Sequence, residues 1–131
     1  MSRSCDKRNI LVVDDDASVC EALTMVLQSF GHRVQSVSSG TQALGIFEPA
    51  KFDVIITDFF MPFMTGDKLA DAIKLLSPSQ PVVMLTAYPE KLRAQAQPIT
   101  SVDCFLAKPF EFDELSAVVT KFPISSDPLC C

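Results

Sequence analysis

The sequence predicts a doubly wound α/β fold, in which a parallel sheet of five strands has helices on both faces. Three observations support this class. Short apolar runs alternate along the chain with longer segments whose apolar residues recur at helical spacing. The runs are continuously apolar, as parallel strands buried on both faces are expected to be. Prolines and glycines separate the segments. The alternation of predicted strands and helices favours right-handed βαβ units.

The first half of the chain predicts three strands and three helices. Residues 10–13 are a short apolar run, and residues 19–30 have helical spacing with Gly31 as the stop signal. The remaining elements of this half are a strand at 33–37, a helix at 41–47 that Pro49 ends, a strand at 54–57, and a helix at 67–76 that begins after Gly66 and closes at Pro78.

The second half predicts two more strands and two more helices. Residues 82–85 are the cleanest β-branched run and predict the fourth strand. Residues 89–97 are a weaker helix candidate that ends at Pro98, and a regular helix through that proline is not expected. A fifth strand follows at 103–107 and a fifth helix at 112–122. The expected organisation is an N-terminal tail at 1–8, one domain at 9–122 and a C-terminal tail at 123–131.

Composition excludes several classes of function. With 131 residues, of which 48% are hydrophobic, the chain has room for one domain with a substantial core. A formal net charge of -5 and the lack of a basic stripe argue against nucleic-acid binding. The polar start MSRSCDKRN is not expected to be a signal peptide. No apolar run approaches the roughly 18 residues that span a bilayer, so no membrane partner is expected.

The cysteines and the histidine predict no metal centre. Five cysteines without paired metal spacing indicate reduced thiols, and a cytoplasmic location is expected. Cys20 and Cys104 lie in apolar patterns and are predicted to be small buried hydrophobes. The single histidine, His32, has no neighbours that could share a metal and is predicted to be an ordinary loop residue.

The residues after the first, third, fourth and fifth predicted strands include carboxylates, a hydroxyl and a lysine. In doubly wound sheets, ligands bind beyond the carboxyl ends of the strands, so chemistry is expected at these positions. They are Asp14, Asp15 and Asp16 after the first strand, Asp58 after the third, Thr86 and Ala87 after the fourth, and Lys108 and Pro109 after the fifth.

The residue types at this edge predict a phosphoryl site. Clustered carboxylates repel one another unless a cation lies between them, and few hard oxygen ligands with open positions are typical of Mg2+. A lysine and a hydroxyl opposite the metal would neutralise phosphoryl oxygens. Asp58 stands alone at a strand end and is the predicted nucleophile, whereas Asp14 and Asp15 form a neighbouring pair that suits metal binding.

Each of these residues also has an ordinary structural interpretation. Asp16 is a candidate cap of the first helix, and Ser18 with Glu21 fits a capping box at nearly the same place. An isolated Asp58 is typical of a turn, and an isolated Lys108 of the solvated surface. Their joint occurrence at matching strand ends favours the functional interpretation.

The sequence resembles a receiver domain of a two-component response regulator. The resemblance covers residues 10 to about 122 and implies a flavodoxin-like fold with strand order 2-1-3-4-5. The resembling stretches are ILVVDDD at 10–16, DVIITD at 53–58 with Met61, Pro62 and Gly66, VMLTA at 83–87 and FLAKPF at 105–110.

The resemblance implies a role for each residue at the edge. Asp58 would accept a phosphoryl group from a phosphohistidine on a sensor kinase or phosphotransfer protein. The metal would be Mg2+ or Mn2+, bound by Asp15, Asp58 and the backbone carbonyl of Phe60, with Asp14 acting mainly through water. Lys108 would contact the phosphoryl oxygens, Thr86 would move toward them, and Phe105 would follow as the aromatic switch. A cis Lys108–Pro109 bond is also implied.

The implied function is signalling rather than turnover of an external substrate. Phosphorylation adds negative charge at the sheet edge, which would draw in Thr86 and Lys108 and reshape the face made by the fourth helix, fifth strand and fifth helix. That face is the expected contact for a homodimer or an output partner. No output module follows residue 122, so a free-standing regulator and the receiver portion of a longer chain both stay open.

Two features depart from the family pattern. Phe60 and Tyr88 occupy the positions two residues after Asp58 and Thr86, where many relatives have small or polar groups. We expect these aromatic side chains to shield the phosphoryl group from water and lengthen its lifetime. The second departure is the segment around Pro98, which predicts a short or irregular fourth helix.

Two other functions are compatible with parts of the sequence. An aspartate-nucleophile hydrolase of the haloacid dehalogenase type would use Asp14 as nucleophile with Asp16 in its acid-x-acid pattern and Lys108 as its lysine, although the chain is short for that fold. A pseudo-receiver would bind partners without phosphorylation. A flavodoxin-type cofactor protein is disfavoured, because no phosphate-binding loop follows the first strand.

Overall fold

A computed structural model describes residues 7–87 and 101–122 of the chain. It contains a sheet of five parallel strands in the order β2-β1-β3-β4-β5, which confirms the predicted topology. The strands are β1 (Asn9–Val13), β2 (Arg33–Val37), β3 (Val54–Asp58), β4 (Val82–Thr86) and β5 (Cys104–Ala107). The helices in the described ranges are α1 (Ala17–Ser29), α2 (Gly40–Ile46), α3 (Gly66–Leu76) and α5 (Phe112–Thr120).

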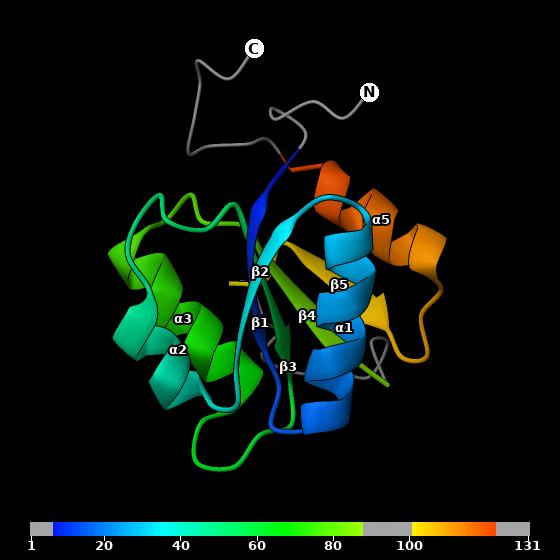
Figure 1. Cartoon of the computed structure of the whole chain (residues 1–131). Helices are drawn as coiled ribbons and strands as arrows, with labels where there is room; N and C mark the ends of the chain where they lie inside the picture. The colour runs from blue at the N-terminus through cyan, green and yellow to red at the C-terminus, as the bar shows by residue number, and fades with distance from the viewer. Residues whose placement is uncertain (1–6, 88–100, 123–131) are drawn as a thin grey trace.

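Helices cover both faces of the sheet (Figure 1). Helices α1 and α5 lie on one face, and α2 and α3 lie on the other. Successive residues of β1 divide between two cores, since side chains alternate across a strand. Ile10 and Val12 pack in the core under α1 and α5, whereas Leu11 and Val13 pack in the core under α2 and α3. Both faces of the central strands are therefore buried.

Burial of the strands follows their place in the sheet. Every residue of β3 and β4 is buried, as the continuous apolar runs predict. The outer strands β2 and β5 are mostly half-buried or exposed, because each has a strand on only one side. The expectation of burial on both faces is therefore right for the central strands and wrong for the two edges.

Helix α1 begins at a side-chain cap and ends before a glycine. Asp16 is the N-cap, since its carboxylate oxygen accepts a 2.9 Å hydrogen bond from the backbone N–H of Ser18. Gly31 follows the helix with φ of +94°, a conformation that favours glycine. Phe30, the last residue of the predicted helix, follows the last turn of α1 and is 41% exposed.

Three predictions about single residues have different outcomes. His32 lies in the loop between α1 and β2, as predicted, but it is buried, and its Nδ1 accepts a 3.1 Å hydrogen bond from the backbone N–H of Arg8. Cys20 is buried as predicted, and Cys104 is half-buried against the same core. Tyr88, the fourth helix at 89–97 and Pro98 lie outside the described residues.

Within residues 7–87 and 101–122, no helix has the length and apolar character needed to cross a membrane.

Candidate phosphoryl site at the carboxyl edge

Three carboxylates meet where β1 and β3 end. The register pairs Val13 with Thr57, so the residues that follow each strand lie at the same edge of the sheet. One carboxylate oxygen each from Asp14, Asp15 and Asp58 lies within 4.8 Å of the other two. Asp14 and Asp58 are buried, with 1% and 8% of their surface exposed, whereas Asp15 is exposed. Two carboxylates of the cluster are therefore buried, and the third is open to solvent.

Lys108 brings a positive charge to the two buried carboxylates. Its Nζ lies 3.0 Å from Asp58 Oδ1 and 3.5 Å from Asp14 Oδ2. The backbone holds it there, because the N–H of Lys108 donates to the carbonyl oxygen of Thr86 at 2.8 Å. The Lys108–Pro109 peptide bond is cis, as the family resemblance implies. An ammonium group thus already lies beside the carboxylate that is predicted to react.

The buried charges shift one another's pKa. Burial raises the pKa of Asp14, and the negative charge of Asp58 adds to this, while a hydrogen bond from the Asp16 backbone and the charge of Lys108 oppose it. Burial on its own lowers the pKa of Lys108. The hydrogen bond to Asp58 and the charges of both aspartates outweigh burial, so that its pKa is raised. Lys108 is therefore a cation throughout the physiological range.

The two predicted switch residues lie on neighbouring strands. Thr86 is the last residue of β4 and is buried, with 1% exposed, and it pairs with Ala107 across to β5. Phe105 lies in β5 opposite Met84 and is half-buried. The hydroxyl of Thr86 is thus at the carboxyl edge, and the aromatic ring is one strand further out in the sheet.

The loop from β3 to α3 folds back tightly on Asp58. The backbone N–H of Gly66 donates to the carbonyl oxygen of Phe59 at 2.9 Å. A Cβ atom at Gly66 would lie 2.2 Å from the carbonyl oxygen of Asp58, a distance that allows no side chain. Met61 is buried in the core within this loop. The sequence predicts that a helix begins after Gly66, and the structure shows that a glycine is needed there because the backbone lies in close contact with that of Asp58.

Two aromatic side chains of the same loop are exposed. Phe60 is 62% exposed, and its ring packs edge to face on Phe59 with 4.8 Å between ring centroids. Phe63 is fully exposed and has a positive φ of 71°. Composition and periodicity do not single out Phe63, since only the backbone conformation shows that it is unusual.

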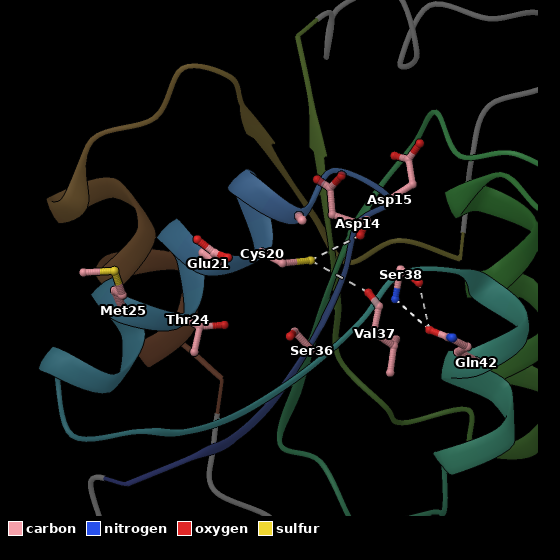
Figure 2. A pocket seen from close by; sticks show the side chains of 11 residues that line it. Asp14, Asp15, Cys20, Glu21, Thr24, Met25, Ser36, Val37, Ser38 and Gln42 are labelled. Carbon is pink, nitrogen blue, oxygen red and sulfur yellow. Dashed lines mark hydrogen bonds between the residues drawn. The ribbon is translucent and has the colours of Figure 1, made fainter.

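A groove of about 630 Å3 adjoins the carboxylates between α1 and β2 (Figure 2). Asp14 and Asp15 lie at one end, and Cys20 lies between them and Val37. The thiol of Cys20 donates to the carbonyl oxygen of Asp14 at 3.2 Å, and the N–H of Asp14 donates to the carbonyl oxygen of Val37 at 3.2 Å. Sequence reasoning missed this support of Asp14, because the contact joins three separate elements.

The carboxylates suit a hard divalent cation. Mg2+ prefers carboxylate, carbonyl and water oxygens and commonly keeps several waters, so one or two protein carboxylates are enough. Asp15 and Asp58 present such oxygens next to the buried Asp14, and no softer nitrogen or sulfur ligand belongs to the cluster. The donor set therefore fits Mg2+ better than a metal that prefers imidazole or thiolate.

A parallel sheet in the order 2-1-3-4-5, with carboxylates, a hydroxyl and a lysine at its carboxyl edge, defines the chain as a doubly wound α/β domain of the flavodoxin-like class. The family model for the response regulator receiver domain matches residues 10–120, and this chain belongs to that family. The match removes the haloacid dehalogenase alternative, because the chain shares the receiver sequence pattern along nearly its whole length.

Curated relatives and solved structures agree with this membership. The chain is 38% identical over 116 residues to the transcriptional regulatory protein ZraR of Escherichia coli K12, which is 88% of this chain and 26% of ZraR. It is 35% identical to the DNA-binding response regulator MtrA of Mycolicibacterium paratuberculosis, over 86% of this chain and 50% of MtrA. The chain thus spans between a quarter and a half of these relatives.

A solved structure resembles the whole described fold. The response regulator TrrA of Thermotoga maritima, in complex with Mg2+ and BeF, has a TM-score of 0.78 and 31% identity. The match covers 87% of this chain and 97% of TrrA. The likeness therefore extends over nearly the whole of TrrA.

Proposed function

We propose that the chain is a phosphorylation switch in which Asp58 accepts a phosphoryl group. One observation carries the proposal, namely that Lys108 Nζ lies 3.0 Å from Asp58 Oδ1 within a cluster of three carboxylates. A single buried lysine–aspartate pair would be an ordinary ion pair. The site holds three carboxylates against the one ammonium group of Lys108, and a bound cation would balance the remaining negative charge.

The transfer uses a carboxylate oxygen of Asp58 as nucleophile. This oxygen forms a bond to phosphorus while the bond from phosphorus to the donor's histidine nitrogen breaks. The electron pair of the broken bond returns to the imidazole ring, which takes a proton from solvent. Lys108 needs no proton transfer in this step, because it stays a cation and contacts the phosphoryl oxygens after moving from the free carboxylate.

Asp15, Asp58 and the backbone carbonyl of Phe60 are the proposed ligands of Mg2+ or Mn2+, with Asp14 contributing mainly through water. When bound, the cation neutralises charge on the phosphoryl oxygens. The carboxylate of Asp14 has a fixed orientation in this site, since one oxygen accepts a hydrogen bond from Lys108 and the other accepts one from the backbone N–H of Asp16.

Phosphorylation changes the charge that Thr86 and Lys108 face. We propose that Thr86 moves toward the new phosphoryl oxygens, that Phe105 follows, and that the face around β5, α5 and the segment between β4 and β5 changes shape. This face would form a homodimer or contact an output partner. Phe60, with Tyr88 in the undescribed segment, is the proposed control on the lifetime of the phosphoryl group.

The proposed donor is a sensor histidine kinase or a histidine phosphotransfer protein, and the proposed location is the cytoplasm. Residues 9–122 would form the receiver domain and the flanking residues its tails. MtrA is named as a DNA-binding response regulator, and this chain covers half of it. Nucleic-acid binding was not expected from the composition of this chain, and a longer protein could bind DNA through another domain.

The test is phosphorylation by a small molecule. The full chain is incubated with Mg2+ and phosphoramidate, and mass spectrometry follows the unmodified protein, Asp58→Asn, and the exposed control Asp113→Asn. We expect labelling of the unmodified protein and of Asp113→Asn but not of Asp58→Asn. Equal labelling of all three would contradict the acceptor assignment. Absence of labelling in all three would favour the pseudo-receiver instead.

A further inference from the structure

The thiol of Cys20 contacts the backbone where β1 and β2 end. It donates to the carbonyl oxygen of Asp14 at 3.2 Å, and its sulfur lies 3.8 Å from the carbonyl oxygen of Val37. Figure 2 shows both contacts, with the side chain pointing from α1 toward these two backbone groups. Because Cys20 is only 8% exposed, water competes little for the two acceptors. The contact is therefore a fixed part of the fold rather than a surface interaction.

Asp14 is held through its backbone as well as its side chain. Its N–H donates to the carbonyl oxygen of Val37 at 3.2 Å. Its carboxylate accepts hydrogen bonds from the backbone N–H of Asp16 at 2.9 Å and from Lys108 Nζ at 3.5 Å. The thiol of Cys20 binds the remaining polar group, the carbonyl oxygen. Every polar group of Asp14 thus has a partner in the protein.

Asp15 has no such support for its own side chain. Its carboxylate is exposed, and among residues 7–87 and 101–122 no donor is hydrogen-bonded to it. The carbonyl group of Asp14 and the N–H of Asp15 belong to one planar peptide unit. A rotation of that unit changes φ of Asp15 and reorients its carboxylate relative to Asp58. The hydrogen bond from the thiol resists this rotation, because it fixes the carbonyl end of the unit.

We propose that Cys20 is a positioning residue for the metal site, whose thiol fixes the peptide unit between Asp14 and Asp15 so that Asp15 presents its carboxylate beside Asp58. The inference rests on the proposed function, because it concerns the carboxylates that are proposed to bind Mg2+. One oxygen of each aspartate in the cluster lies within 4.8 Å of the others, so a small reorientation of Asp15 changes how closely they approach one cation. Groups that orient metal ligands commonly change metal affinity by about tenfold or more when they are mutated.

The alternative role for Cys20 is to fill the core. It packs with Leu23 and Leu27 in the core under α1 and α5, where a small apolar side chain would serve equally well. A core role affects stability alone, whereas a positioning role affects Mg2+ binding as well. Cys104 provides the comparison, because its thiol is half-buried against the same core and its sulfur lies 3.7 Å from the carbonyl oxygen of Phe105, away from the carboxylates.

The experiment separates positioning from core packing. Urea unfolding of the full chain is measured in reducing buffer at several Mg2+ concentrations. The free energy of unfolding without Mg2+ reports the core, and its rise with Mg2+ gives the dissociation constant, because a ligand that binds only the folded state stabilises it. The variants are Cys20→Ala, which removes the donor, Cys20→Ser, which keeps a donor, and the matched control Cys104→Ala. A second control is Thr24→Val, since Thr24 lines the same groove and its hydroxyl has no hydrogen-bond partner among the described residues.

We expect Cys20→Ala to raise the dissociation constant for Mg2+ by about three- to tenfold, the lower end reflecting the weakness of a thiol as a donor. Cys20→Ser should stay within about twofold of the unmodified chain. Cys104→Ala should lose stability without a change in Mg2+ binding, and Thr24→Val should leave Mg2+ binding unchanged. Should Cys20→Ala not fold, Cys20→Val fills the same space without a donor and has the same expected effect.

Two results would overturn the positioning role. One is an unchanged dissociation constant for Mg2+ in the variants of Cys20 that lack a donor. The other is an equal loss of affinity in Cys104→Ala, which would assign the effect to the core. If Mg2+ did not stabilise the unmodified chain at all, the proposed metal site itself would be wrong, and the role of Cys20 would be wrong with it.

Discussion

Two adjacent aspartates at the end of β1 have different surroundings. Asp14 is 1% exposed and bonded to Lys108 and to the Asp16 backbone, whereas Asp15 is exposed. Sequence position alone does not separate them, because both follow the same apolar run. Burial makes the charge of Asp14 costly, whereas the carboxylate of Asp15, a proposed metal ligand, is open to solvent.

The pH dependence of stability should reflect Asp14. Burial raises the pKa of its carboxyl in the folded protein, so its contribution to stability is fully present below the unfolded pKa of about 4 and is lost as pH rises through the folded value. In metal-free buffer, Asp14→Asn should therefore be more stable than the unmodified protein at pH 7, and the difference should shrink toward pH 4. Urea unfolding at several pH values measures this.

The exposed neighbour provides the control for Asp14. Asp15→Asn removes the same charge without relieving a buried group, so we expect a much smaller gain in stability. A titration with Mg2+ should show weaker binding by both variants, by about tenfold or more. An Asp14→Asn variant that is no more stable than Asp15→Asn at neutral pH would contradict this account of burial.

Phe60 should influence how long the phosphoryl group persists. Its ring is 62% exposed and packed on Phe59, at the rim where water would approach the aspartyl phosphate. The aspartyl phosphate of Phe60→Asn should hydrolyse about tenfold faster than that of the unmodified protein, since a polar group would admit and orient water. Decay of phosphorylated protein, followed by mass after removal of the donor, measures the rate. Phe112→Asn on α5, also 62% exposed, is the matched control, and unchanged or slower decay in Phe60→Asn would refute the shielding role.

At the scale of elements, the β3–α3 connection has a single geometric requirement. Gly66→Ala would place a Cβ 2.2 Å from the carbonyl oxygen of Asp58, so either the end of β3 or the start of α3 must shift. We expect a loss of about 1–3 kcal/mol in unfolding free energy, together with slower phosphorylation. Denaturant unfolding and labelling by phosphoramidate report the two effects.

Gly45 is the matched glycine within a helix. It lies in α2 with no atom within 4 Å of a Cβ, so Gly45→Ala should stabilise the protein by roughly 0.5–1 kcal/mol and leave phosphorylation unchanged. If both glycine variants had the same effect on stability, the close contact at Gly66 would not be its cause.

At the scale of the whole molecule, one arginine joins the two ends of the domain. The guanidinium of Arg8 donates to the carbonyl oxygen of Phe122 at 3.0 and 3.1 Å and to that of Thr120 at 3.2 Å. Its backbone N–H donates to the buried His32. The start of β1, the start of β2 and the end of α5 therefore meet at Arg8. This residue lies at the edge of the sheet where the strands begin, and the acidic cluster lies at the edge where they end.

Removal of that side chain should loosen the end of α5. Arg8→Ala deletes a charged donor from the carboxyl end of a helix, and we expect a loss of about 1–2 kcal/mol and faster amide exchange in the last turn of α5. Lys7→Ala removes the same charge from the adjacent exposed position and should have little effect. Equal amide exchange in the two variants would show that the contacts of Arg8 do not hold α5.

Much of the fold was predictable because it depends on local pattern. The apolar runs located both ends of all five strands to within one residue. The ends of the helices were predicted less accurately, since α5 ends at Thr120 rather than at Phe122. The edge strands were misjudged in burial, because the position of a strand in the sheet is not a local property.

The sequence by itself determined the family, the order of the elements and the chemical types at the strand ends, because periodicity and motif spacing are written along the chain. Only the tertiary structure decided which aspartate is buried, that His32 is a buried acceptor, that Cys20 supports Asp14, and that Phe63 is exposed with a positive φ. These properties depend on contacts between segments far apart in the sequence. Burial and backbone conformation are set by those contacts rather than by any residue alone.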